Sequence, residues 1–173
     1  DWNLLDPDIL RWSLVGGATR EFVRDLFELR RTIEPDAVRF AAARRTDTQL
    51  KKIEDALIRM ETRKAMSSEA IAADIQFHEH IFEASGNQAL SCLKGVVATT
   101  IHWSQNLKRQ IGVAEFKRSL RDHRRIYEAI AARDGELAAA HAVLLVADAL
   151  SSTVDAMQQV SIAPISLPRR PIK

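Results

Sequence analysis

Three side chains in this sequence are of types that bind metal ions: Asp74, His78 and His123. Asp74 and His78 are four residues apart, so on a helix they lie one turn from each other and can share one ion or one hydrogen bond. Apolar residues recur with helical spacing around them: Ile71, Ile75, Phe77, Ile81 and Phe82. This pattern places both polar side chains on the side of a helix that faces the core. His123 lies on a second apolar stripe, which also directs it inward. One carboxylate oxygen and two imidazole nitrogens suit a borderline divalent metal and leave positions open to water or an anion.

The same three residues have a structural explanation as well. Each histidine can be a hydrogen-bonded core residue, and Asp74 can pair with a neighbouring cation. The sequence contains no dense ligand motif such as HExxH beside them. The spacing alone therefore leaves a metal site and a hydrogen-bonded core as alternatives.

Arg30 is the side chain best suited to bind an acid. It falls on the apolar stripe of a long helix, whereas Arg31 points away from it. A guanidinium holds a carboxylate through two parallel hydrogen bonds, and the alternative role for Arg30 is a salt bridge to Asp74 or a nearby glutamate. His102 and Asn106, one turn apart, are further candidates to line the same cavity and bind the effector. Alternatively, both residues are ordinary polar side chains exposed on a helix surface.

The elements that must position these residues are helical. Glycine (6) and proline (5) are scarce in the 173 residues, while alanine, leucine, arginine and glutamate abound, and this composition predicts an all-α fold. Caps and apolar spacing predict helices over residues 7 to 16, 19 to 44, 47 to 64, 68 to 86, 88 to 110, 113 to 131 and from 135 onward. Pro35, inside the second helix, is expected to bend it near residues 31 to 35.

Charge and hydropathy exclude several classes of protein. Twenty-five basic residues balance 23 acidic ones along the helix faces, so the chain has no concentrated phosphate-binding patch and is a poor nucleic-acid binder by itself. The single cysteine, Cys92, lies among small and apolar residues and is expected to be a buried thiol in a reducing cytoplasm. The longest apolar run, residues 142 to 150, contains Asp148 and is too short to span a bilayer. A soluble protein without a membrane partner is therefore expected.

Four segments resemble the ligand-binding C-terminal domain of the FadR subfamily of GntR transcription regulators: DWNLLDPDILRW, FELRRTIEPDAVRFAAARRT, ADIQFHEHIFEASGNQAL and DHRRIYEAIAARD. The resemblance covers about residues 1 to 160. Its most specific elements are Asp-x-x-x-His at 74 to 78 followed by Gly-Asn at 86 and 87, and the His-x-x-Ile-x-x-Ala-Ile that begins at His123. WNLLDPDIL and the Arg-Arg-x-x-Glu-Pro at 30 to 35 are most similar to the galactonate-operon repressor branch.

The resemblance implies an antiparallel bundle of six to seven helices that encloses a central ligand pocket. Such a domain is usually a homodimer, senses a small organic acid and controls an N-terminal winged helix-turn-helix domain that binds DNA. Residues 1–160 would form the effector-binding and dimerisation domain, and residues 161–173 a flexible tail. The DNA-binding domain itself is expected to be absent from this chain, which starts without methionine.

The resemblance also assigns roles to particular residues. It places the family's metal ligands on Asp74, His78 and His123, and its effector-binding arginine on Arg30. A further family histidine falls on Leu145, so that ligand is missing, and His141 lies one turn earlier. The expected ion is zinc or nickel.

The resemblance predicts a cytoplasmic, non-enzymatic sensor of a small carboxylate, such as a sugar acid of the aldonate type. Two alternatives belong to other classes of protein. One is a metal-dependent helical-bundle enzyme, and the other is a metal-free helical interaction module.

Overall fold

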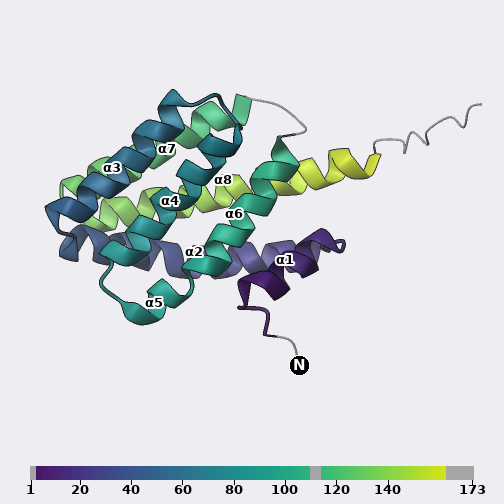
Figure 1. Cartoon of the computed structure of the whole chain (residues 1–173), viewed down its shortest axis with the longest axis horizontal. Coiled ribbons are helices and arrows are strands. Elements are labelled where there is room, and N and C mark those ends of the chain that lie inside the picture. Colours follow the sequence, from purple (N-terminus) through teal and green to yellow (C-terminus); the bar gives the residue numbers. More distant parts are fainter. Residues whose placement is uncertain (1–2, 110–113, 163–173) are drawn as a thin grey trace, which may run out of the picture.

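The computed structural model describes residues 3–109 and 114–162. These residues form eight α-helices: α1 (Pro7–Val15), α2 (Arg20–Arg44), α3 (Asp47–Thr62), α4 (Ser68–Ala84), α5 (Gln88–Cys92), α6 (Lys94–Lys108), α7 (Ala114–Ala131) and α8 (Gly135–Ile162). The two longest helices, α2 and α8, run along the long axis of the molecule (Figure 1). Helices α3, α4 and α7 lie beside them towards the left end of the molecule in Figure 1. Helices α1 and α6 lie towards the right end. No residue in the described ranges is in a strand, which confirms the all-α helical bundle.

Short polar side chains begin the helices at the predicted places. The N-caps are Asp6, Thr19, Thr46 and Ser67, and each side chain accepts hydrogen bonds from backbone N–H groups of the first turn. At Thr46 the contact is reciprocal, because the Gln49 side chain accepts from the Thr46 N–H at 2.9 Å. Helix α4 is followed by Gly86, whose φ of 62° is in the left-handed region that favours glycine. The chain therefore enters and leaves α4 where the sequence predicts.

Two sequence-based predictions about the segment after α4 are wrong. The single helix expected over residues 88 to 110 is two helices, because the chain turns at Leu93 and α6 starts anew at Lys94. This turn brings α6 against α1, where a Cβ on Gly95 would lie 2.8 Å from Cγ of Pro7. Cys92 is exposed rather than buried, because α5 contributes no buried residue.

Helix α2 continues through Pro35, so the proline does not divide it. The bend near residues 31 to 35 stays a prediction. The last helix extends to Ile162 and so includes the first two residues of the expected tail, whose remainder lies outside the described residues.

The main core lies where α2, α3, α4, α7 and α8 meet. Its largest fully buried side chains include Phe77, Phe82, Leu57, Ile126 and Ile130. The ring of Phe77 meets the rings of His78 and His123 edge-on, at centroid distances of 5.7 and 5.1 Å. The apolar core thus forms one wall around these two histidines.

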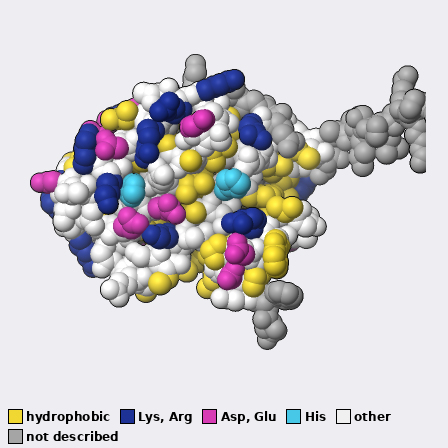
Figure 2. Space-filling view, in the orientation of Figure 1, with side chains coloured by type: hydrophobic (Ala, Val, Ile, Leu, Met, Phe, Trp, Pro, Cys, Tyr) yellow, Lys and Arg dark blue, Asp and Glu magenta, His cyan; other side chains and the backbone are white. Residues whose placement is uncertain are grey.

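Helix α8 is long and apolar enough to cross a membrane by length and composition alone. In the structure it packs against α2 and α7. A core helix of a bundle has the same composition, so these properties do not indicate a membrane span. Figure 2 shows one face of the molecule, where basic and acidic side chains are mixed and hydrophobic side chains gather mainly towards α6 and α1.

Candidate metal centre

Asp74, His78 and His123 meet in the interior, and each is less than a tenth exposed. Oδ1 of Asp74 lies 3.1 Å from Nε2 of His123 and 3.5 Å from Nε2 of His78, and the two Nε2 atoms are 3.3 Å apart. Ligand atoms around a tetrahedral zinc ion are about 3.3 Å from each other. The three atoms, from α4 and α7, therefore have the mutual distances that one bound ion requires.

The second ring nitrogen of each histidine is bonded elsewhere. Nδ1 of His78 is 2.9 Å from Oε2 of Glu34, and Nδ1 of His123 is 2.7 Å from the backbone carbonyl oxygen of Ser119. A carbonyl oxygen only accepts, so Nδ1 of His123 carries a proton. In the neutral ring Nε2 then presents a lone pair towards Asp74, whereas a protonated ring donates from Nε2 to Asp74. Two acceptors that face each other in a buried place require a cation between or beside them.

A proton on His78 meets this requirement when no metal is bound. Burial alone would lower the pKa of His78, but the carboxylates of Glu34 and Asp74 outweigh it and raise the pKa to about 9. The imidazolium then donates from Nδ1 to Glu34 and from Nε2 towards Asp74. A metal ion bound at Nε2 would take the place of this proton, so metal and proton would compete for the same position.

Glu34 connects the three candidate ligands to Arg30. Nε of Arg30 donates to Oε1 of Glu34 at 2.5 Å, and both side chains are buried. Burial alone would raise the pKa of Glu34, but Arg30 and His78 outweigh it and lower the pKa to about 2. An ionised Glu34 fixes the orientation of the His78 ring, as outer partners of metal-ligating histidines do.

The structure thus shows the salt bridge that was the alternative role of Arg30, and Arg30 lines the cavity as well. Sequence reasoning did not identify Glu34. Its position one turn after Arg30, on the same apolar stripe, is the signal that identifies it.

Gln105 is a second residue that sequence reasoning missed. Its Nε2 donates to Oδ2 of Asp74 at 2.7 Å, which leaves Oδ1 directed at the two imidazole rings. Burial alone would raise the pKa of Asp74, but His123 and His78 hold it well below its usual range. Gln105 is on α6, and its role depends on how α6 crosses α4, which residue spacing does not reveal.

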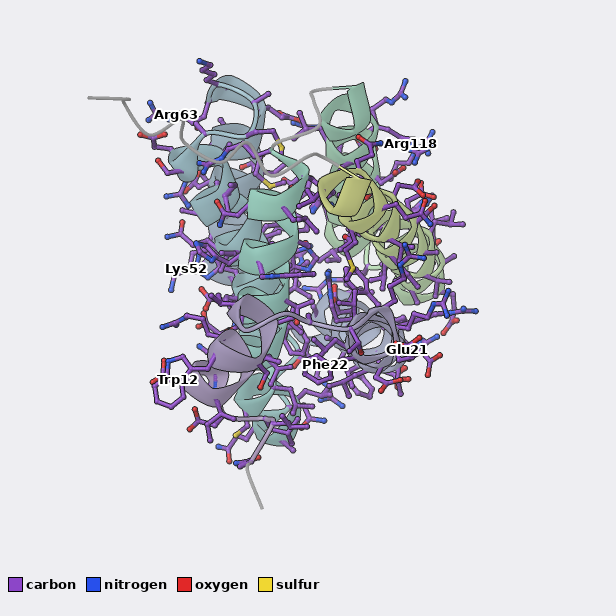
Figure 3. All side chains as sticks on the ribbon, turned by 90° about the vertical axis from the view of Figure 1, so that its right-hand side faces the viewer. Trp12, Glu21, Phe22, Lys52, Arg63 and Arg118 are labelled. Atoms are coloured by element: carbon purple, nitrogen blue, oxygen red, sulfur yellow. The ribbon has the colours of Figure 1, made fainter. Side chains whose placement is uncertain are left out.

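A cavity of about 50 Å³ adjoins the three ligand atoms. Its inner end is formed by Asp74, His78, His123 and Arg30, all buried. What we call the outer end consists of Lys108 of α6, Arg118 and Asp122 of α7, and Asp148 and Ser152 of α8. Figure 3 shows Arg118 on α7 close to α8.

His102 and Asn106 are not among the residues that line this cavity, and their role in effector binding stays a prediction. They border a separate open hollow between α1, α4 and α6, which Trp103 also lines. Ser104 of α6 faces the cavity. His102 and Asn106 are each two positions from Ser104, about 200° around the helix, so they lie on the other side of α6. The residues of α6 that line the cavity are Ile101, Ser104, Gln105 and Lys108.

Leu145 lines the cavity, at the position where the resemblance places a further ligand. His141, one turn earlier on α8, is partly exposed and is not among the lining residues. Within the part of the chain that the structure describes, the group of residues able to hold a metal consists of Asp74, His78 and His123.

Comparison with known proteins assigns the chain to a family. The family model of the FCD domain matches residues 25–159. The chain belongs to the FCD domain family. This FCD domain is 29% identical over 147 residues to the galactonate operon transcriptional repressor of Escherichia coli (strain K12), covering 84% of this chain and 64% of the repressor. It is 33% identical over 125 residues to the HTH-type transcriptional regulator LutR of Bacillus subtilis (strain 168), covering 70% of this chain and 57% of LutR.

A solved structure of Streptococcus agalactiae GntR resembles the FCD domain with a TM-score of 0.63 and 28% identity, covering 75% of this chain and 58% of that one. These findings confirm the resemblance to the C-terminal domain of FadR-subfamily GntR regulators. The relatives are regulators of transcription, a family without enzymatic activity, which confirms that the domain is not an enzyme. The chain spans less than two thirds of the length of each of these relatives.

The metal-free FCD domain is expected to lose stability as the pH rises from neutral. The pKa of His78 is about 9 in the folded protein, above the ordinary value of 6.5 for a histidine side chain, so its contribution to stability is complete below pH 6.5 and is lost as the pH rises through 9. A shift of this size corresponds to roughly 3 kcal/mol of unfolding free energy. Urea denaturation between about pH 6 and pH 10 measures it.

The variant His78→Gln should lack this pH dependence. His80→Gln is the matched control, since His80 is on the same helix but bonds only Glu83 near the surface, and it should keep the wild-type profile. Identical profiles for wild type and His78→Gln would show that His78 does not carry the buried proton.

Proposed function

We propose that this FCD domain is the effector-sensing domain of a GntR-family transcription regulator, and that its effector is a small carboxylic acid, such as a sugar acid of the aldonate type. The observation that carries the proposal is the convergence of Asp74, His78 and His123 beside Arg30 in one cavity. Buried titratable groups that converge on a cavity mark ligand sites. Family membership supports the same function, since one relative is named as the galactonate operon repressor.

A divalent ion, zinc or nickel, is the cofactor that we propose for this site. Asp74 would hold it through Oδ1, and His78 and His123 through Nε2, with Glu34 and Gln105 fixing the ligand orientations. Bound there, the ion would offer its remaining coordination positions to a carboxylate oxygen and a neighbouring hydroxyl of the effector.

Arg30 would neutralise the charge of the effector. A guanidinium has five N–H donors, and the contact with Glu34 uses the one at Nε. Because Arg30 also lines the cavity, its terminal nitrogens are the groups that would hold the carboxylate in two parallel bonds.

Effector binding would be transmitted through the helices that meet at the site. In the complete regulator, residues 1–160 would form the effector-binding and dimerisation domain of a homodimer, preceded by a winged helix-turn-helix domain that contacts DNA. An effector that binds one arrangement of α2, α4 and α7 more tightly would shift the population towards it and so change the spacing of the DNA-binding domains. We place this regulator in the cytoplasm, where it reaches DNA.

Removal of one proposed ligand should weaken metal binding and effector binding together. For His123→Ala we expect metal and effector affinities to fall by about 10-fold or more, measured by calorimetric titration of zinc and then of galactonate and gluconate, with and without chelator. His141→Ala is the matched control on α8 and should bind as the wild type does. The proposal fails if His123→Ala loses only stability and keeps both affinities, or if the wild type binds no small acid.

A histidine at position 145 should strengthen metal binding. Leu145 is buried and lines the cavity, so Leu145→His adds a nitrogen ligand next to the three existing ones. We expect zinc affinity to rise by about 10-fold or more, as read from competition with a chromogenic chelator. Leu144→His is the control, because Leu144 is the neighbouring residue but is 57% exposed and does not line the cavity. An equal effect of both substitutions would show that zinc is bound elsewhere.

A further inference from the structure

Helix α6 brings two consecutive polar residues, Ser104 and Gln105, to the wall of the cavity. Both are largely buried, with 2% and 9% of their surfaces exposed. Nε2 of Gln105 donates to Oδ2 of Asp74 at 2.7 Å, so the amide group lies directly beside the candidate metal ligands. The groups that these two residues present to the cavity therefore bear on what can bind at its inner end.

The contact with Asp74 fixes the orientation of the Gln105 amide. An ionised carboxylate only accepts hydrogen bonds, so the amide nitrogen has to face Asp74 and the amide oxygen, Oε1, faces elsewhere. No side chain or backbone group of the described residues donates to Oε1. The one fully enclosed side-chain atom that lacks a partner in the described ranges is Nε of Arg45, so Oε1 is accessible, and the cavity is the open space that Gln105 lines.

Ser104 supplies a second acceptor next to the first. Its hydroxyl donates to the backbone carbonyl oxygen of Ile101 at 3.1 Å, one turn earlier in α6. This bond uses the single proton of the hydroxyl and leaves the lone pairs of Oγ available. Consecutive residues of α6 thus offer the cavity two hydrogen-bond acceptors, Oγ and Oε1.

An effector hydroxyl supplies the donor that these acceptors lack. A methylene group in the same place would expel water from Oε1 and leave a buried acceptor unpaired, which costs about 1–3 kcal/mol. The cavity volume of about 50 Å³ holds only a few water molecules, so a group that reaches Gln105 is close to the carboxylate that Arg30 would hold. The carbon next to the carboxylate is therefore the one expected to carry this hydroxyl.

We propose that Gln105 and Ser104 determine effector specificity by accepting a hydrogen bond from a hydroxyl group next to the effector's carboxylate, so that the site selects 2-hydroxy acids over acids that lack this hydroxyl. Gln105 then has two roles at two atoms, because Nε2 orients Asp74 and Oε1 reads the effector. This inference rests on the proposed binding of a small acid beside the metal centre.

The test compares acids that differ only in this hydroxyl, titrated calorimetrically into the domain with zinc and, in parallel, with chelator. One pair is galactonate and 2-deoxygalactonate, and the other is lactate and propionate, so that chain length does not decide the outcome. We call the ratio of the two affinities within a pair the hydroxyl preference. In the wild type it should be about 10 or more, since a site built to bind a hydroxyl rejects the analogue that lacks it.

Gln105→Met keeps the approximate length of the side chain but removes the amide. Loss of the bond to Asp74 should weaken binding of both acids in a pair alike, and this shared loss cancels in the hydroxyl preference. Loss of Oε1 weakens only the hydroxy acid, so the preference should fall to about 1–2. Ser104→Ala leaves the amide in place and should reduce the preference by about 3-fold.

Thr100→Val is the matched control. Thr100 is also buried on α6, one turn before Ser104, and its hydroxyl likewise donates to a backbone carbonyl of the same helix, that of Val96. It does not line the cavity, so its substitution should leave the hydroxyl preference unchanged. Thermal melts of the three variants show whether each is folded, and Ser104→Ala alone still tests the inference if Gln105→Met does not fold.

Equal affinity of the wild type for both members of a pair overturns the inference while the sensing function stands. A hydroxyl preference that neither Gln105→Met nor Ser104→Ala reduces also overturns it, because other residues then read the hydroxyl. Binding of none of the four acids overturns the proposed function, on which the inference rests.

Discussion

A hydrogen bond at Nδ1 orients each of the two buried imidazole rings, and the whole site depends on this constraint. Glu34 holds the ring of His78, and the Ser119 carbonyl holds that of His123. Both Nε2 atoms consequently face Oδ1 of Asp74 within 3.5 Å. Three electron-rich atoms at this distance in the interior repel one another unless a cation joins them. The fold therefore creates a position for one positive charge, which a proton or a metal ion can fill.

Every charge near this position has a partner from another turn or another helix. Arg30 balances Glu34 within α2, Glu34 bonds His78 of α4, and Gln105 of α6 bonds Asp74. Loss of one partner leaves an uncompensated buried charge. This loss destabilises the folded protein by far more than the intact pair stabilises it. His123 of α7 also contacts Asp74, so four helices depend on the same set of contacts. A ligand that rearranges these contacts would shift the helices. This dependence is the physical link between binding and regulation in the function that we propose.

The sequence predicts the inner end of the cavity better than the outer end. Helical spacing placed Asp74, His78 and His123 inward and separated Arg30 from Arg31, and burial confirms each of these placements. Spacing places a residue on a face of its own helix, but it does not show which residues of another helix lie opposite. The role of Gln105 depends on how α6 crosses α4, and it could not be predicted for this reason. The turn at Leu93 was missed because Leu93 is itself an ordinary helix-forming residue, and the nearby Gly95 lies inside the first turn of α6.

X-ray absorption at the zinc edge, recorded on the domain loaded with one zinc per chain, tests the metal centre most directly. The predicted spectrum shows two imidazole nitrogens and additional oxygen ligands at about 2.0–2.1 Å, without sulfur. These ligands correspond to His78, His123 and Asp74, completed by solvent or effector oxygens. A sulfur ligand at about 2.3 Å from Cys92, a spectrum without imidazole scattering, or a chain that takes up no zinc would contradict the proposed site.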